Sequence, residues 1–145
     1  MNQKAGIGTS FDLGFSWKEI QDKLSPDEAV VEIASIKKIG ALKDKFRKSD
    51  AVLGLSENRF YAAIIIKKES KNPEIVFYEK GDFIEGPLMK NYQKYVDFYP
   101  HIPSDDLYEY LWKPLEEKLS GIKKIYLSAD GAFNKISLYS IKYPN

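Results

Sequence analysis

The positions of apolar and polar residues predict a helix, then strands, then helices, and finally two more strands. The first helix begins at Ser16, which with Glu19 has the spacing of a capping box, and an apolar stripe follows at helical intervals. It ends before Ser25-Pro26, because the residue before a proline avoids helical geometry. A short amphipathic helix therefore precedes the strands.

Three segments in the next part of the chain have the composition of strands. Residues 28–36 are rich in β-branched side chains, and the apolar run over residues 59–67 indicates a strand that is buried on both faces. Residues 74–79 follow after a turn, so residues 59–79 predict a hairpin. Between the first two segments, residues 51–55 suit a short strand or an inward-packing loop.

After Gly81 the apolar spacing changes to that of helices. Residues 83–98 carry apolar side chains three and four apart, and a second helix is predicted from a cap at Ser104. Pro114 interrupts this second pattern, which predicts a kink or two abutting helices. The leucines of the second pattern lie four apart, at Leu107, Leu111, Leu115 and Leu119.

Two further strands are predicted after the helices. Residues 122–128, Ile-Lys-Lys-Ile-Tyr-Leu-Ser, predict a strand that ends in the turn Ala129-Asp130-Gly131, and residues 133–141 alternate apolar and polar positions. A strand that follows a long helical crossover joins its sheet parallel to an earlier strand. The expected fold class is therefore α/β, a mixed sheet with helical cover.

The amino-acid composition excludes several kinds of functional site. The 145 residues include 22 Lys and Arg, 21 Asp and Glu, no Cys and a single His, for a formal net charge of +1. Without a thiol the chain has no disulfide, no cysteine-ligated zinc and no cysteine nucleophile. A net charge near zero argues against a general polyanion binder. The first ten residues lack a continuous apolar run, so we predict no signal peptide and expect a cytoplasmic location.

No group of residues predicts a catalytic, cofactor-binding or metal site. His101 stands between two prolines, and we interpret it as a loop residue rather than a general base. The adjacent acids Asp105-Asp106 and Glu116-Glu117 do not face each other on a helix, so we interpret them as helix-end and surface charges. Ser128 has neither a nucleophile-elbow pattern nor a partner histidine.

Two segments are enriched in one kind of side chain. Lys37–Lys48 has six basic residues and one acid, which suits phosphate contacts but is more typical of a solvated helix face or loop. Tyr92–Trp112 is dense in aromatic residues that could line a peptide groove or stack on bases, but its helical spacing favours packing in the core. Tyr110 lies off the leucine stripe and is expected to be exposed.

Three segments, taken in order, resemble the beginning of a CHAT domain, the caspase-like domain usually found behind tetratricopeptide repeats in bacterial proteins. They are Ser16–Leu24 followed by Asp27–Ile33, then Tyr108–Leu115, and then Ile122–Leu138, which is the most specific. Ala129 stands where the family commonly has proline. The resemblance covers most of the chain, from about Ser16 to Ile141.

The resemblance implies an incomplete caspase-like α/β/α sandwich. Residues 1–15 would be a flexible lead-in, and residues 16–145 the N-terminal half of the domain. Active members of the family are cysteine peptidases related to caspases and separases, and their His-Gly and Cys come after the segment that Ile122–Leu138 resembles. No catalytic residue is therefore carried over to this sequence, and His101 lacks the His-Gly context.

We therefore expect a non-enzymatic structural or protein-interaction module without a cofactor. Missing neighbouring strands would leave an open apolar sheet edge, which predicts an oligomer such as a strand-paired dimer, or a protein partner, and no nucleic acid or membrane. A second interpretation is a fragment of an active CHAT cysteine peptidase whose His and Cys lie beyond Asn145. The least favoured is a nucleic-acid-binding module that uses Lys37–Lys48.

Overall fold

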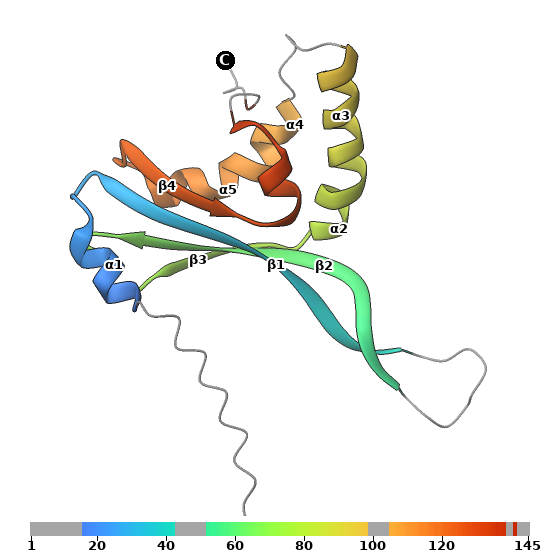
Figure 1. Cartoon of the computed structure of the whole chain (residues 1–145), viewed down its shortest axis with the longest axis horizontal. Coiled ribbons are helices and arrows are strands. Elements are labelled where there is room, and N and C mark those ends of the chain that lie inside the picture. Colours follow the sequence, from blue (N-terminus) through green and yellow to red (C-terminus); the bar gives the residue numbers. More distant parts are fainter. Residues whose placement is uncertain (1–15, 43–51, 99–104, 139–140, 142–145) are drawn as a thin grey trace, which may run out of the picture.

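The fold is built on a four-stranded mixed sheet (Figure 1). The computed structural model describes residues 16–42, 52–98, 105–138 and 141. The strands are β1 (Glu28–Leu42), β2 (Val52–Lys67), β3 (Glu74–Tyr78) and β4 (Lys124–Ala129), in the order β3-β2-β1-β4. β2 pairs antiparallel with β1 and with β3, whereas β4 pairs parallel with β1. The α/β class, the hairpin and the parallel strand after the helices are thus confirmed.

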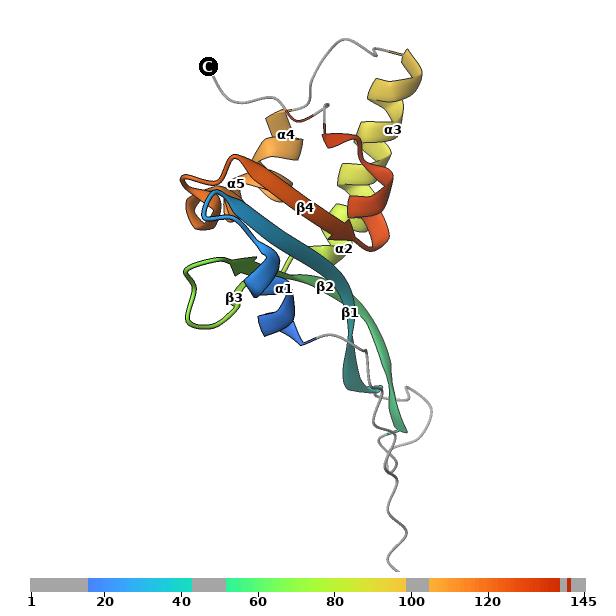
Figure 2. The ribbon, with the colours of Figure 1, turned by 60° about the vertical axis from the view of Figure 1, so that its left-hand side comes forward.

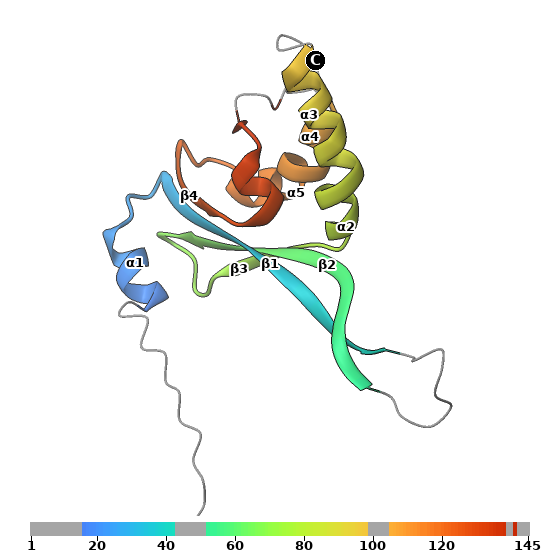
Figure 3. The same cartoon turned by 45° about the vertical axis from the view of Figure 1, so that its right-hand side comes forward.

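The helices lie mostly on one face of the sheet. A first run comprises α2 (Gly81–Phe83), the π-helix η1 (Ile84–Leu88) and α3 (Met89–Phe98). A second run comprises α4 (Asp105–Leu107), the π-helix η2 (Tyr108–Trp112), α5 (Lys113–Glu116) and the 3-10 helix η3 (Glu117–Leu119). Figures 1 and 3 show both runs above the sheet, whereas α1 (Trp17–Lys23) lies at one end of the opposite face.

The main core lies between the sheet and the two helical runs. Alternate residues of the two central strands point to this side and are buried, because successive side chains in a strand point to opposite faces. They are Ala29, Val31 and Ile33 of β1, and Tyr61, Ala63 and Ile65 of β2. The four predicted leucines of the second helical run are also buried, which confirms that they face the sheet.

The capping box at the start of α1 is confirmed. The Ser16 N–H donates to Oε2 of Glu19 at 2.6 Å, and the Glu19 N–H donates to the Ser16 hydroxyl at 3.3 Å. Gln21 then fixes the helix to the turn between β2 and β3, because its side-chain amide donates to the carbonyls of Lys67 and Ser70, each at 2.7 Å. The helix ends at Lys23, ahead of Pro26, as predicted.

Each helical run contains one π-turn beside a proline. Pro114 follows η2, and the Lys113 N–H donates to the carbonyl of Tyr108, five residues back. Pro87 lies inside η1, and the Met89 N–H reaches the carbonyl of Ile84. Proline has no N–H and its ring clashes with the carbonyl four residues back, so a wider turn removes the clash. The predicted irregularity at Pro114 is confirmed, and its form is a π-turn.

The central strands are longer than the sequence pattern indicates. Residues 37–42 were expected to lie in a solvated helix face or loop, but they continue β1, and residues 52–55 belong to β2 instead of forming a separate short element. The two strands pair along this extension, with a register shift between Lys37 and Ile39. Hydrogen bonds between neighbouring strands therefore override the local composition.

The predicted final strand over residues 133–141 is wrong. Gly131–Lys135 forms the 3-10 helix η4, and the only further sheet-like residue in the described part of that segment is an isolated bridge at Ile141. Phe133 and Ile136 are both buried and lie three residues apart, which fits a helix with three residues per turn. In a strand these two residues would point to opposite faces, and only Ile136 and Leu138 have the alternating spacing that predicted the strand.

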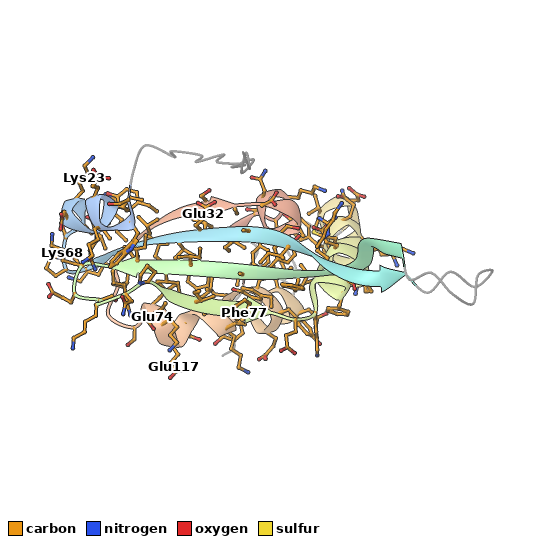
Figure 4. All side chains as sticks on the ribbon, turned by 90° about the horizontal axis from the view of Figure 1, so that it is seen from below. Lys23, Glu32, Lys68, Glu74, Phe77 and Glu117 are labelled. Carbon is orange, nitrogen blue, oxygen red and sulfur yellow. The ribbon has the colours of Figure 1, made fainter. Side chains whose placement is uncertain are left out.

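Burial of β2 on both faces is only partly confirmed. On the face opposite the helical runs, Ala62 and Ile66 are buried, but Ile64 is 37% exposed. The neighbouring β3 residues on this face, Ile75 and Phe77, are 53% and 62% exposed. Figure 4 views this face, with Phe77 on β3 and Glu32 on β1. No described helix covers its centre, because α1 lies only at one end.

Candidate functional site

A polar cluster lies at the carboxyl end of β4, beside the middle of β1. Asp130 follows β4, and its carboxylate accepts hydrogen bonds from the N–H of Ser35 in β1 at 3.3 Å and from the N–H of Gly131 at 2.7 Å. The Asp130 N–H donates to the carbonyl of Ile33 at 3.0 Å. The turn predicted at Ala129-Asp130-Gly131 is therefore fastened directly to β1.

Tyr61 and Glu85 connect this turn to β2 and η1. The Tyr61 hydroxyl donates to Oε1 of Glu85, and both groups accept from the Ala132 N–H, at 2.9 Å to Tyr61 and 3.2 Å to Glu85. The Arg59 guanidinium lies 3.5 Å from Oε1 of Glu85 and donates to the Ser35 hydroxyl at 3.1 Å. Four segments that are distant in sequence thus share one hydrogen-bond network.

The polar groups of this network are engaged with one another. Burial, together with the hydrogen bond to Glu85, raises the pKa of Tyr61 from 10.0 to about 12, so the phenol stays protonated at neutral pH. Its hydroxyl is already engaged on both sides by Glu85 and Ala132. None of the described members is a nucleophile with an adjacent free base. The network therefore fixes the course of the chain after β4.

An apolar groove runs beside β4 on the face that carries the helical runs. The groove encloses a cavity of about 70 Å³ between β4, the second helical run and the residues after η4. Leu127 and Leu138 are 36% and 46% exposed at this groove. Its lining is entirely apolar: Val31, Ile33, Leu111, Trp112, Leu115, Leu119, Ile125, Leu127, Phe133, Ile136, Leu138 and Ile141.

The outer edge of β4 adjoins the groove. Among the described residues β4 has a neighbouring strand on one side only, and Figure 2 shows β1 between it and β2. The N–H groups of Lys124 and Asp130 donate to the carbonyls of Asp27 and Ile33, so the even-numbered residues of β4 bond to β1. In a parallel pair the alternate residues direct their N–H and C=O the other way. Ile125, Leu127 and Ala129 therefore direct these groups away from β1.

Several residues singled out in the sequence have ordinary structural positions. Tyr92 and Tyr108 are buried in the core, as expected. Tyr110 was expected to be exposed, but it is half-buried because its ring packs against Phe83 at a centroid distance of 4.6 Å. Glu116, interpreted as a surface charge, accepts a hydrogen bond from the Tyr108 hydroxyl at 2.5 Å.

Other candidates are not brought together. His101, Ser104 and Lys43–Lys48 lie outside the described residues, while Ser128 is exposed on β4. Across the described ranges, no three His, Cys, Asp or Glu side chains gather to hold a metal ion. No helix in the described part of the chain is long and apolar enough to cross a membrane.

The sequence did not indicate the network around Tyr61 and Glu85. Arg59 and Tyr61 stand in an apolar run, and Glu85 stands in a helical segment 24 residues after Tyr61. The only local signal was a phenol within a strand expected to be buried, since buried tyrosine hydroxyls require a partner. The identity of that partner is a property of the fold.

Comparisons of the chain with protein-family models, with curated proteins and with solved structures find no match. The class of protein is therefore given by the fold, an α/β protein with a mixed four-stranded sheet and helices packed against it.

Proposed function

We propose that this chain is the first, non-catalytic part of a CHAT-like, caspase-related domain and acts as a protein-interaction module. Its binding surface is the outer edge of β4 with the adjoining apolar groove. The mixed sheet with both helical runs on one face is consistent with the first part of a caspase-like sandwich. The uncovered centre of the other face is consistent with a sandwich that lacks its second layer.

The β4 edge carries this proposal. Strand addition requires backbone groups that point outward and pockets for alternate side chains. β4 supplies the outward groups at Ile125, Leu127 and Ala129, and the groove on its helix-bearing face supplies the apolar pocket. An added strand would hydrogen-bond to these groups and place every second side chain over the groove.

Amide hydrogen exchange by NMR tests the β4 edge directly. In dilute protein we expect the N–H groups of Ile125, Leu127 and Ala129 to exchange rapidly, while those of Tyr126 and Ser128, which face β1, exchange slowly. Binding by strand addition should slow the first set, and the amides of the opposite edge strand, β3, serve as the control.

Two results would contradict the interaction role. Slow exchange of all β4 amides in dilute monomer would mean that the edge is already occupied. Rapid exchange of the outward amides at every protein concentration, together with no enriched binder from a displayed library of extended nonapeptides, would mean that the edge receives no partner.

The peptidase alternative also has an observation in its favour. In open α/β sheets, ligands bind outside the carboxyl ends of the strands, and the polar cluster around Asp130 lies at the carboxyl end of β4. We expect no turnover of fluorogenic peptides by the homogeneous chain, because its sequence has no thiol. Sequencing of the source DNA past Asn145 tests the alternative, which predicts an in-frame His-Gly segment and a later strand followed by Cys.

A further inference from the structure

The segment that follows β4 forms one wall of the apolar groove. Residues 131–138, which we call the strap, contribute Phe133, Ile136 and Leu138 to the lining of the groove. Phe133 and Ile136 are buried and the two residues between them are exposed, so the strap packs on the fold through one side only. Figure 2 shows this segment, in red, at the end of β4. The position of the strap therefore sets the width of the groove.

Tyrosine hydroxyl groups hold the strap near both of its ends. The Ala132 N–H donates to the Tyr61 hydroxyl at 2.9 Å, and the Ser137 N–H donates to the Tyr92 hydroxyl at 3.0 Å. Within the described ranges, no ladder of backbone hydrogen bonds joins residues 131–138 to a strand of the sheet. The strap is therefore attached at a few side-chain contacts, whereas the strands are paired along their length.

The attachment to the sheet changes between Asp130 and Gly131. The Asp130 N–H donates to the Ile33 carbonyl at 3.0 Å, and the Asp130 carboxylate accepts from the Ser35 N–H at 3.3 Å, so Asp130 is fixed to β1. Gly131 has a φ of +59°, and glycine adopts positive and negative φ with similar ease. A change of the backbone angles at Gly131 therefore moves the strap and leaves β4 in place.

We propose that the strap opens as a unit about Gly131, and that the groove receives its partner only while the strap is closed. This inference rests on the proposed function, since it describes the regulation of the same binding surface. Opening removes the wall formed by Phe133, Ile136 and Leu138, so an added strand loses apolar contacts on that side. A ligand that binds only the closed state also holds the strap closed, because the coupling between ligand and conformation is reciprocal.

Native-state hydrogen exchange measures this opening. The opening exposes the Ala132 and Ser137 amides and leaves the Asp130 amide bonded to β1. We therefore expect Ala132 and Ser137 to share one protection factor, which is lower than that of Asp130. Their exchange should also depend less on urea than that of Asp130, because the strap exposes little surface when it opens.

Two tyrosine variants test which contacts keep the strap closed. Tyr92→Phe keeps the ring and removes the hydroxyl that accepts from Ser137, so exchange of both strap amides should be about three- to tenfold faster. Tyr78→Phe is the matched control, because the Tyr78 hydroxyl donates to the Leu111 carbonyl and not to the strap. The control should leave the exchange of the strap amides unchanged.

A bound peptide distinguishes regulation of the groove from a purely structural role of the strap. The probe is a nonapeptide, selected from the displayed library, that slows exchange of the outward β4 amides. At about 100 times its Kd, a peptide that binds only the closed state should slow exchange of Ala132 and Ser137 about 100-fold. A strap that had no connection with the groove would exchange at the same rate with and without the peptide.

The outcomes separate this inference from the proposed function. Strap amides that exchange only as slowly as Asp130, or that do not respond to Tyr92→Phe, overturn the opening. Slower exchange of the outward β4 amides with unchanged or faster exchange of the strap overturns the regulation, while the proposed function stands. A library that yields no binder contradicts the proposed function itself and removes the regulation with it.

Discussion

Gly131 provides a sharp test of the turn that follows β4. Its φ is +59°, and a Cβ at this position would lie 2.1 Å from the Tyr61 hydroxyl oxygen and 2.6 Å from Oε1 of Glu85. The substitution Gly131→Ala therefore meets two separate penalties. One is the left-handed backbone, and the other is displacement of the Tyr61 and Glu85 groups that hold the Ala132 N–H.

The expected loss in the free energy of unfolding is the sum of these two penalties. A left-handed conformation costs a residue with a Cβ about 1–2 kcal/mol. Leaving a buried donor or acceptor without its partner costs about 1–3 kcal/mol more. We therefore expect Gly131→Ala to lower the free energy of unfolding by about 2–5 kcal/mol, or the Tm by about 5–15 °C for a chain of this size.

Gly121 is the matched control. Its φ is +79°, but no atom outside its immediate neighbours lies within 4 Å of the position of a Cβ. Gly121→Ala should therefore have the backbone penalty alone, about 1–2 kcal/mol. The difference between the two variants isolates the contribution of the Tyr61 and Glu85 contacts, because the conformational penalty is common to both.

The assay is urea unfolding followed by far-ultraviolet circular dichroism, with each glycine variant also made in a Tyr61→Phe background. Removal of the hydroxyl removes the closest clash, so the cost of Gly131→Ala should shrink in that background while the cost of Gly121→Ala stays constant. Equal costs for the two glycine variants within about 0.5 kcal/mol, or strict additivity with Tyr61→Phe, would refute the reasoning.

Three further predictions concern pH and helix capping. Burial raises the folded-state pKa of Tyr61 from 10.0 to about 12 and also raises that of Tyr78. The stability that these two phenols contribute is therefore intact below pH 10 and is lost as the pH rises further. The urea midpoint should fall between pH 10 and pH 12, and it should fall less steeply in Tyr61→Phe. The hydrogen bond from Lys67 lowers the pKa of the Glu74 carboxyl from 4.5, so the stability that Glu74 contributes is present above that pH and is lost in acid. The substitution Glu74→Gln should lower the free energy of unfolding by less than about 1 kcal/mol at neutral pH. The stability of this variant should also depend less on pH in the acid range. Ser16→Ala should cost about 1 kcal/mol in α1, which is seen as faster exchange of its first amides while the exchange of β1 amides stays constant.

Much of the fold could be predicted from the sequence, because it depends on local interactions. The capping box at Ser16, the leucine stripe of the second helical run and the parallel β4 each depend on residues a few positions apart or on the order of the elements. The end of α1 before Pro26 has the same origin, since proline restricts the residue before it. The features of the helices are determined within short stretches of chain, whereas the direction of β4 follows from the order of the elements.

Pairing with distant segments decided the rest. Residues 37–42 became strand because β2 supplies their hydrogen-bond partners, and residues 131–135 became a 3-10 helix because Tyr61 and Glu85 hold the Ala132 N–H. The β4 edge and its groove exist only where β1, the second helical run and the residues after η4 meet. The sequence by itself determined which residues are apolar and where the chain turns. The tertiary structure decided which backbone N–H and C=O groups are paired and which remain open, because backbone pairing depends on contacts between segments that lie far apart in the chain.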